Sequence, residues 1–114
     1  MATPLSIRAQ TLQQRLAQGE AIQLVDVRED QELELARFSW PVLHLPLSRS
    51  NEWIAQIPAL LEHDRPVAVL CHAGVRSWQF GCWLMEQQGY GDVLNLQGGI
   101  DAWSVEVDPA VPRY

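Results

Sequence analysis

A short apolar run, V-A-V-L at residues 67–70, most limits what this chain can fold into. Pro66 precedes the run, and a polar segment that contains a glycine follows it. A continuous apolar run of this length is typical of a strand in a parallel sheet, where both faces of the strand are covered. Three similar runs are also predicted strands: residues 22–25, 42–45 and 93–96.

Segments with helical spacing of apolar side chains alternate with these strands. The predicted helices cover residues 6–17, 29–36, 48–61 and 77–88, and a last helix occupies residues 98–103. Pro58 is expected to split the third helix into two short ones. This alternation predicts one α/β domain over residues 1–114, with a small parallel sheet and helices. Ligands of such sheets bind beyond the carboxyl ends of the strands, so the segment after residue 70 is the expected site.

Composition narrows the class of function. The net charge of -6 argues against nucleic acid as a partner. No apolar run is long enough to cross a bilayer and no signal peptide is visible, so we expect a cytoplasmic protein that does not bind membranes. A monomer is the default for a small acidic domain. All eight basic residues are arginine, which excludes lysine-based chemistry.

The segment after the central strand combines a cysteine with features that stabilise an anion. Its candidate site residues are Cys71, His72, Ala73, Gly74, Val75, Arg76 and Ser77. A following helix would present free N–H groups to the cysteine, and Gly74 would let the backbone curl so that these groups point inward. Arg76 would add a positive charge. Together these effects favour the thiolate, and a pKa lowered by ~2 units from ~8.5 would make most of the thiol reactive at neutral pH.

The alternative interpretation is that Cys71 is a buried, unreactive thiol with a structural role, because most free cysteines are of that kind. Cys82 lies inside a predicted helix and is interpreted as a small apolar residue. His44 and His63 lack metal-ligand spacing to any neighbour, so neither a metal nor a cofactor is expected.

Four motifs carry a resemblance to a known family. They are L-V-D-V-R-E at residues 24–29, C-H-A-G-V-R-S at 71–77, G-Y-G-D-V-L-N-L at 89–96 and Q-G-G-I-D-A-W at 97–103. The second is similar to the rhodanese active-site loop, C-x-x-G-x-R-S, and the others match rhodanese motifs in order and spacing. The chain is therefore identified as a member of the rhodanese-like (single-domain thiosulfate sulfurtransferase) family, which implies the rhodanese fold, with helices on both faces of the sheet.

The resemblance also implies a mechanism and a set of roles. The Cys71 thiolate would take a sulfane sulfur from thiosulfate or a persulfide donor and pass it to a thiol, cyanide or carrier-protein acceptor. The N–H groups of residues 72–77 would cradle the persulfide, and Arg76 would hold the donor's oxyanion. Independently of the resemblance, Asp26 and Arg28 leave the first predicted strand beside the site. Their expected role is structural, with Asp26 capping the next turn or pairing with an arginine, and a direct part in substrate binding is the alternative.

Two segments bear on how far the resemblance extends. Residues 36–41 read A-R-F-S-W-P where many family members have G-H-I-x-G-A, which leaves the local turn and the rim of the site open. Residues 103–114 are similar to the ending of rhodanese domains that are fused to adenylyltransferases and pass sulfur to small carrier proteins. This ending favours a protein sulfur acceptor.

Three other functions use related chemistry. Cysteine phosphatases have C-x5-R, whereas Cys71 and Arg76 form the shorter C-x4-R, which favours sulfur transfer. A non-catalytic rhodanese module used for binding or regulation usually lacks the cysteine, which is present here. An arsenate reductase needs a second reducing cysteine near the loop, and none is present.

Overall fold

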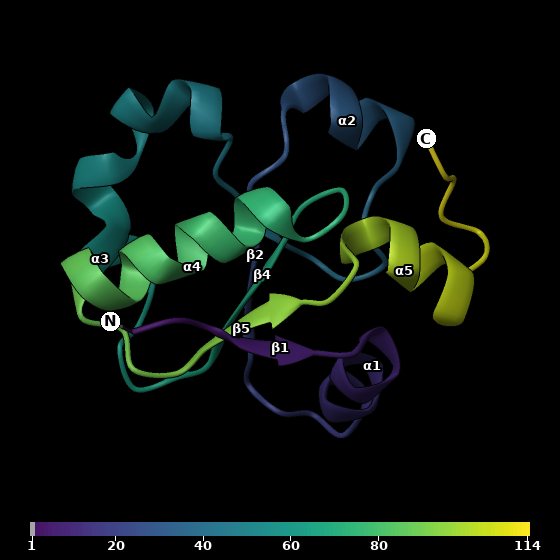
Figure 1. The fold of residues 1–114 in the computed structure, drawn as a ribbon, viewed down its shortest axis with the longest axis horizontal. Coiled ribbons are helices and arrows are strands. Elements are labelled where there is room, and N and C mark those ends of the chain that lie inside the picture. Colours follow the sequence, from purple (N-terminus) through teal and green to yellow (C-terminus); the bar gives the residue numbers. More distant parts are fainter. Residues whose placement is uncertain (1) are drawn as a thin grey trace.

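The computed structural model describes residues 2–114 (Figure 1), and in them five parallel strands form one sheet in the order β1-β5-β4-β2-β3. The strands are β1 (Leu5–Ile7), β2 (Gln23–Asp26), β3 (Leu43–His44), β4 (Val67–Leu70) and β5 (Val93–Leu96). The predicted α/β class and parallel sheet are confirmed. β4 lies in the middle of the sheet and all four of its residues are buried, as its unbroken apolar sequence requires.

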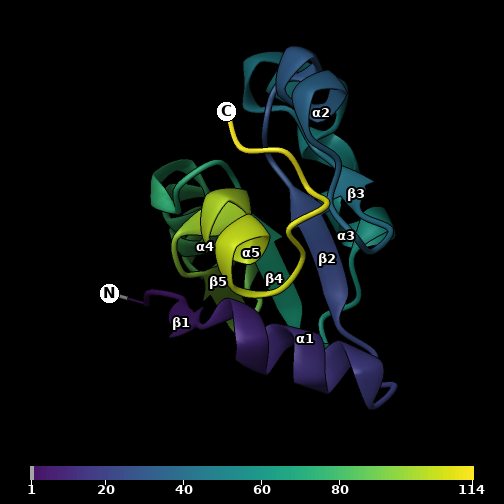
Figure 2. The ribbon, with the colours of Figure 1, turned by 90° about the vertical axis from the view of Figure 1, so that its right-hand side faces the viewer.

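Helices follow the strands. The α-helices are α1 (Ala9–Ala17), α2 (Asp30–Leu35), α3 (Ile57–Leu60), α4 (Val75–Gln88) and α5 (Gly99–Glu106), and two 3-10 helices are η1 (Leu47–Glu52) and η2 (Ile54–Gln56). In Figures 1 and 2, α2 and the C-terminal tail lie side by side at one end of the molecule. None of these helices is both long and apolar enough to cross a membrane.

The two faces of the sheet build two separate apolar cores. Alternate residues of β4 enter different cores, because successive side chains of a strand point to opposite faces. Ala68 and Leu70 belong to the core covered by α1 and α5, which contains Trp103. Val67, Val69 and Cys71 belong to the core covered by α3 and α4. Helices therefore cover both faces, and Cys71, which directly follows β4, is still buried in one of the two cores.

Three of the predicted elements differ from the structure. Residues 6 and 7 were expected to start a helix, but residues 5–7 form the strand β1, which pairs with β5. A strand of three residues is too short to show the alternating pattern that would have predicted it. Pro58 does not split a helix. It occupies the first turn of α3, where its missing N–H costs no hydrogen bond. The helical conformation of residues 47–60 is interrupted near Arg49 and Trp53 instead. Helix α4 begins at Val75, two residues before the predicted start, which places Arg76 in its first turn.

Candidate functional site

Two glycines shape the loop between β4 and α4. Gly74 has φ +105° and is the N-terminal cap of α4, so the chain turns there in a conformation that other residues rarely adopt. Gly99, with φ +62°, lies against the loop: a Cβ at this position would stand 2.3 Å from the carbonyl oxygen of His72. The N–H groups of Ile100 and Asp101 bind the carbonyl oxygens of Cys71 and His72 at 2.9 and 3.2 Å. The start of α5 thus binds the first two carbonyl oxygens of the loop and fixes this part of its backbone.

The loop N–H groups converge on the thiol of Cys71. The residue is 1% exposed, and its Sγ accepts a hydrogen bond from the N–H of Gly74 at 3.1 Å. Burial raises the pKa of Cys71, but hydrogen bonds from the Ser77 hydroxyl and from the N–H groups of Ser77, Gly74 and Ala73 outweigh it. The pKa therefore falls below the usual value of a cysteine. The direction of this shift agrees with the expectation from the loop sequence. Its causes are the backbone donors and Ser77, and the charge of Arg76 is not among them.

Asn95 completes the site from the neighbouring strand. Its Nδ2 donates to the carbonyl oxygen of Gly74 at 3.0 Å, and the hydroxyl of Ser77 donates to its Oδ1 at 2.5 Å. The same hydroxyl oxygen lies 3.3 Å from Sγ of Cys71. Asn95 is 6% exposed and was not assigned a role from the sequence. The sequence did contain a signal for such a role, since Asn95 is a polar residue inside the otherwise apolar strand V-L-N-L.

Arg76 does not lie free beside the thiol. Its NH1 and NH2 groups donate to the two carboxylate oxygens of Glu32 in α2, at 2.6 and 2.9 Å. Hydrogen bonds from Arg76 are the main reason why the pKa of Glu32 falls to about 2. A guanidinium has five N–H donors, so three remain for a bound group. The sequence analysis did not identify Glu32 as a partner, because it lies 44 residues from Arg76 in the chain.

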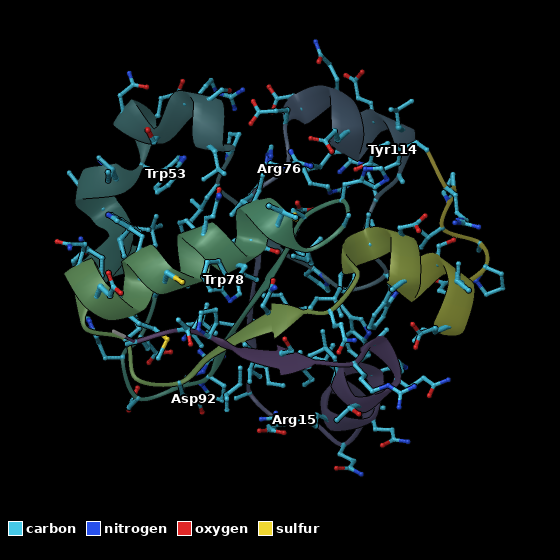
Figure 3. The ribbon with its side chains drawn as sticks, in the orientation of Figure 1. Arg15, Trp53, Arg76, Trp78, Asp92 and Tyr114 are labelled. Carbon is cyan, nitrogen blue, oxygen red and sulfur yellow. The ribbon has the colours of Figure 1, made fainter. Side chains whose placement is uncertain are left out.

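The tail brings Tyr114 into the same cluster. Figure 3 shows Arg76, from the start of α4, and Tyr114, from the tail, both beside α2. The Tyr114 hydroxyl donates to Oε2 of Glu32 at 2.7 Å, and its ring stacks on the imidazole of His72 with centroids 4.1 Å apart. Burial is the main reason why the pKa of Tyr114 rises to about 12, so the phenol stays a donor. The role of Tyr114 was not predicted either.

Asp26 and Arg28 form a buried ion pair behind the loop. Both residues are 0% exposed, and the guanidinium donates to both carboxylate oxygens at 2.8 to 3.2 Å. Arg28 also donates to the Tyr114 hydroxyl and to the carbonyl oxygen of Glu32, each at 3.2 Å. Arg28 thus supports the Glu32 and Tyr114 cluster and is shielded from solvent.

The remaining candidates lie apart or are exposed. Ala73 and Val75 are exposed on the outer side of the loop, and Val75 is 67% exposed. Cys82 is half-buried on α4, and burial raises the pKa of its thiol. In residues 2–114 no three His, Cys, Asp or Glu side chains are grouped to hold a metal.

Comparison with known proteins agrees with this geometry. The model of the rhodanese-like domain family matches residues 8–106, so the chain belongs to that family. A solved rhodanese-like domain protein from Staphylococcus aureus has the same fold, with a TM-score of 0.75, 25% identity, and coverage of 96% of this chain and 98% of that one.

Two of three similar proteins are named for the same broad activity. A protein from Allochromatium vinosum named a sulfurtransferase is 43% identical over 86% of this chain and 86% of its own length. A thiosulfate sulfurtransferase from Pseudoalteromonas translucida is 32% identical over 92% of each chain. A rhodanese-like/PpiC domain-containing chloroplast protein from Arabidopsis thaliana is 42% identical over 81% of this chain, which spans 30% of that protein. The names of the Allochromatium and Pseudoalteromonas proteins support a sulfurtransferase activity in general.

Proposed function

We propose that the protein is a sulfurtransferase that carries sulfane sulfur as a persulfide on Cys71. One observation carries this proposal: a buried thiol with a lowered pKa receives hydrogen bonds from the start of a helix. The thiolate is the nucleophile in sulfur exchange, and fixed N–H donors need no reorganisation when charge appears on sulfur. The relatives named sulfurtransferases support the same reaction class.

The reaction has two steps. With thiosulfate, the thiolate of Cys71 forms a bond with the outer sulfur, the S–S bond of the donor breaks, and sulfite leaves with the electron pair. The N–H groups of Ala73, Gly74 and Ser77 stabilise the anion before and after this step. In the second step an acceptor thiolate, cyanide or a carrier protein takes the outer sulfur, and the Cys71 thiolate is restored.

The partners and location follow from this chemistry. A small sulfur donor such as thiosulfate, or a persulfide, loads the cysteine, and a protein accepts the sulfur. We propose that the protein acts in the cytoplasm, because a reducing compartment keeps both of its free thiols available. We also propose that it is a monomer, which is the default for a small acidic domain.

Intact mass measurement tests the proposal. The purified protein is incubated with thiosulfate, or with a cysteine desulfurase and cysteine, beside C71S and C82S variants. We expect a gain of about 32 Da in the wild type and in C82S, reversed by cyanide, and no gain in C71S. A protein that gains no sulfur from either donor, or gains it on Cys82, contradicts the proposal. It would favour a non-catalytic binding module instead.

A further inference from the structure

The arginines nearest the reactive thiol are already matched by carboxylates. Arg76 holds Glu32 through two hydrogen bonds, and Arg28 holds Asp26 in a fully buried pair. The positive charge that the loop sequence offers to a substrate is therefore largely compensated before any substrate arrives. What remains for the incoming group is a set of neutral N–H donors around Sγ, together with the N–H groups of Arg76 that Glu32 does not engage, on a guanidinium whose charge the carboxylate balances.

Glu32 is held in this position by contacts that do not involve Arg76. Its Oε1 accepts the N–H of Glu29 at 3.1 Å in the capping box of α2, and its Oε2 accepts the Tyr114 hydroxyl at 2.7 Å. Tyr114 is itself fixed by a hydrogen bond from Arg28 and by its stacking on His72. The carboxylate is therefore fixed in place, since these two hydrogen bonds to Glu32 would have to break to release it, in addition to the pair with Arg76.

Compensation of the Arg76 charge by Glu32 affects two kinds of sulfur donor differently. Thiosulfate is a dianion, and its approach to a thiolate needs positive charge to offset the repulsion. A thiol persulfide presents the same kind of sulfur with at most one negative charge, and it is uncharged in the form R–S–SH that accepts the thiolate, so neutral N–H donors are sufficient for it. Because Glu32 cancels the charge of Arg76, the reaction with thiosulfate is disfavoured. The reaction with a persulfide is hardly affected.

We propose that Glu32 determines the donor specificity of this site, by neutralising Arg76 so that Cys71 accepts sulfur from thiol persulfides in preference to thiosulfate. This inference rests on the proposed function. In the step concerned, the Cys71 thiolate forms a bond with the outer sulfur of R–S–SH. The original S–S bond breaks, its electron pair leaves on R–S⁻, and the outer sulfur keeps its hydrogen, which gives Cys71–S–SH.

The test compares donors in the wild type and in E32Q. Glutamine keeps an oxygen that can accept the N–H of Glu29 and is also favoured at this capping position, so the helix start is preserved while the charge is removed. E34Q makes the same change at an exposed position of α2 and is the matched control. The measured quantity is the second-order rate constant of persulfide formation on Cys71, followed by intact mass. The donors are thiosulfate and the persulfide of 2-mercaptoethanol.

We expect the wild type to react faster with the persulfide. In E32Q the ratio of the thiosulfate rate constant to the persulfide rate constant should rise about 10-fold, which is the usual size of the effect of one adjacent charge. In E34Q the ratio should stay at the wild-type value. A wild type that prefers thiosulfate, or a ratio that does not rise in E32Q, overturns the assignment of Glu32. If no donor loads Cys71 in the wild type, the proposed function itself fails.

A second measurement needs no variant. Added salt screens repulsion between like charges, so the thiosulfate rate constant of the wild type should increase with ionic strength. The rate constant for the persulfide of 2-mercaptoethanol should change much less. A thiosulfate rate constant that falls with salt would show an uncompensated positive charge at the site, and it would overturn the proposal independently of how E32Q folds.

Discussion

Asn95 donates its side-chain N–H to the carbonyl oxygen of Gly74 at 3.0 Å, and this bond fixes which way its amide faces. A carbonyl can only accept, so the Asn95 oxygen must point to Ser77, whose hydroxyl donates to it. The single hydroxyl hydrogen of Ser77 therefore has two possible acceptors, Oδ1 of Asn95 at 2.5 Å and Sγ of Cys71 at 3.3 Å, and the contact with Asn95 competes with the one to sulfur. Asn95 thus affects the reactive sulfur without touching it.

The first prediction concerns the effect of a negative charge introduced at position 95 of β5. N95D replaces the amide by a carboxylate that repels both the Gly74 carbonyl and the Cys71 thiolate, so the pKa of Cys71 should rise by about 1 unit or more. The rate of alkylation by iodoacetamide, measured against pH, reports this pKa. Q97E makes the same amide-to-carboxylate change two residues further on, at an exposed side chain, and should leave the alkylation profile nearly unchanged. Equal shifts in both variants would contradict a role for the Asn95 contacts.

The second prediction concerns the approach of α5 to the loop. G99A places a methyl group 2.3 Å from the His72 carbonyl oxygen, at a residue with φ +62°, so the loop must shift. We expect a loss of about 2–4 kcal/mol in the free energy of unfolding, and a loss of persulfide formation in the protein that remains folded. Urea unfolding and intact mass measure the two effects.

G91A is the control for this substitution. A Cβ on Gly91 meets nothing within 4 Å, and its φ is not in the left-handed region, so the stability should change by less than about 1 kcal/mol. If G99A is as stable and as active as G91A, the close contact between Gly99 and the loop does not shape the site.

The sequence was sufficient to predict those features of the fold and of the site that depend on residues close together in the chain. The apolar run of β4, the glycine at position 74 and the cysteine between them act through local conformation, and they place the loop at the correct edge of the sheet. Contacts between distant segments could not be predicted in this way. Glu32 reaches Arg76 from another helix, and Tyr114 reaches Glu32 from the tail, so no periodicity or spacing links them. These distant contacts set the charge at the site.

The third prediction concerns the buried pair behind the loop. D26N leaves the guanidinium of Arg28 buried without its counter-ion, and breaking a buried pair in this way costs about 3–5 kcal/mol. Urea unfolding of D26N should therefore show a large fall in stability. E20Q breaks the exposed pair with Arg15 and should have almost no effect, since solvent screens such pairs. A small effect of D26N would mean that solvent or another group reaches Arg28 in the variant.

The last prediction follows the titration of Glu32. Its pKa is about 2 in the folded protein against 4.5 for an unperturbed glutamate, because Arg76 stabilises the charged form. A carboxylate whose pKa is lowered by folding stabilises the protein above its unfolded pKa, and this contribution disappears as the pH falls through the folded pKa. The wild type should therefore exceed E32Q in the free energy of unfolding by on the order of 1–2 kcal/mol at pH 6, after allowance for solvent screening. The difference should shrink between about pH 5 and about pH 2, and urea titrations at several pH values measure it. A difference that is independent of pH would show that the glutamine disturbs packing and that the charge of Glu32 contributes nothing to stability.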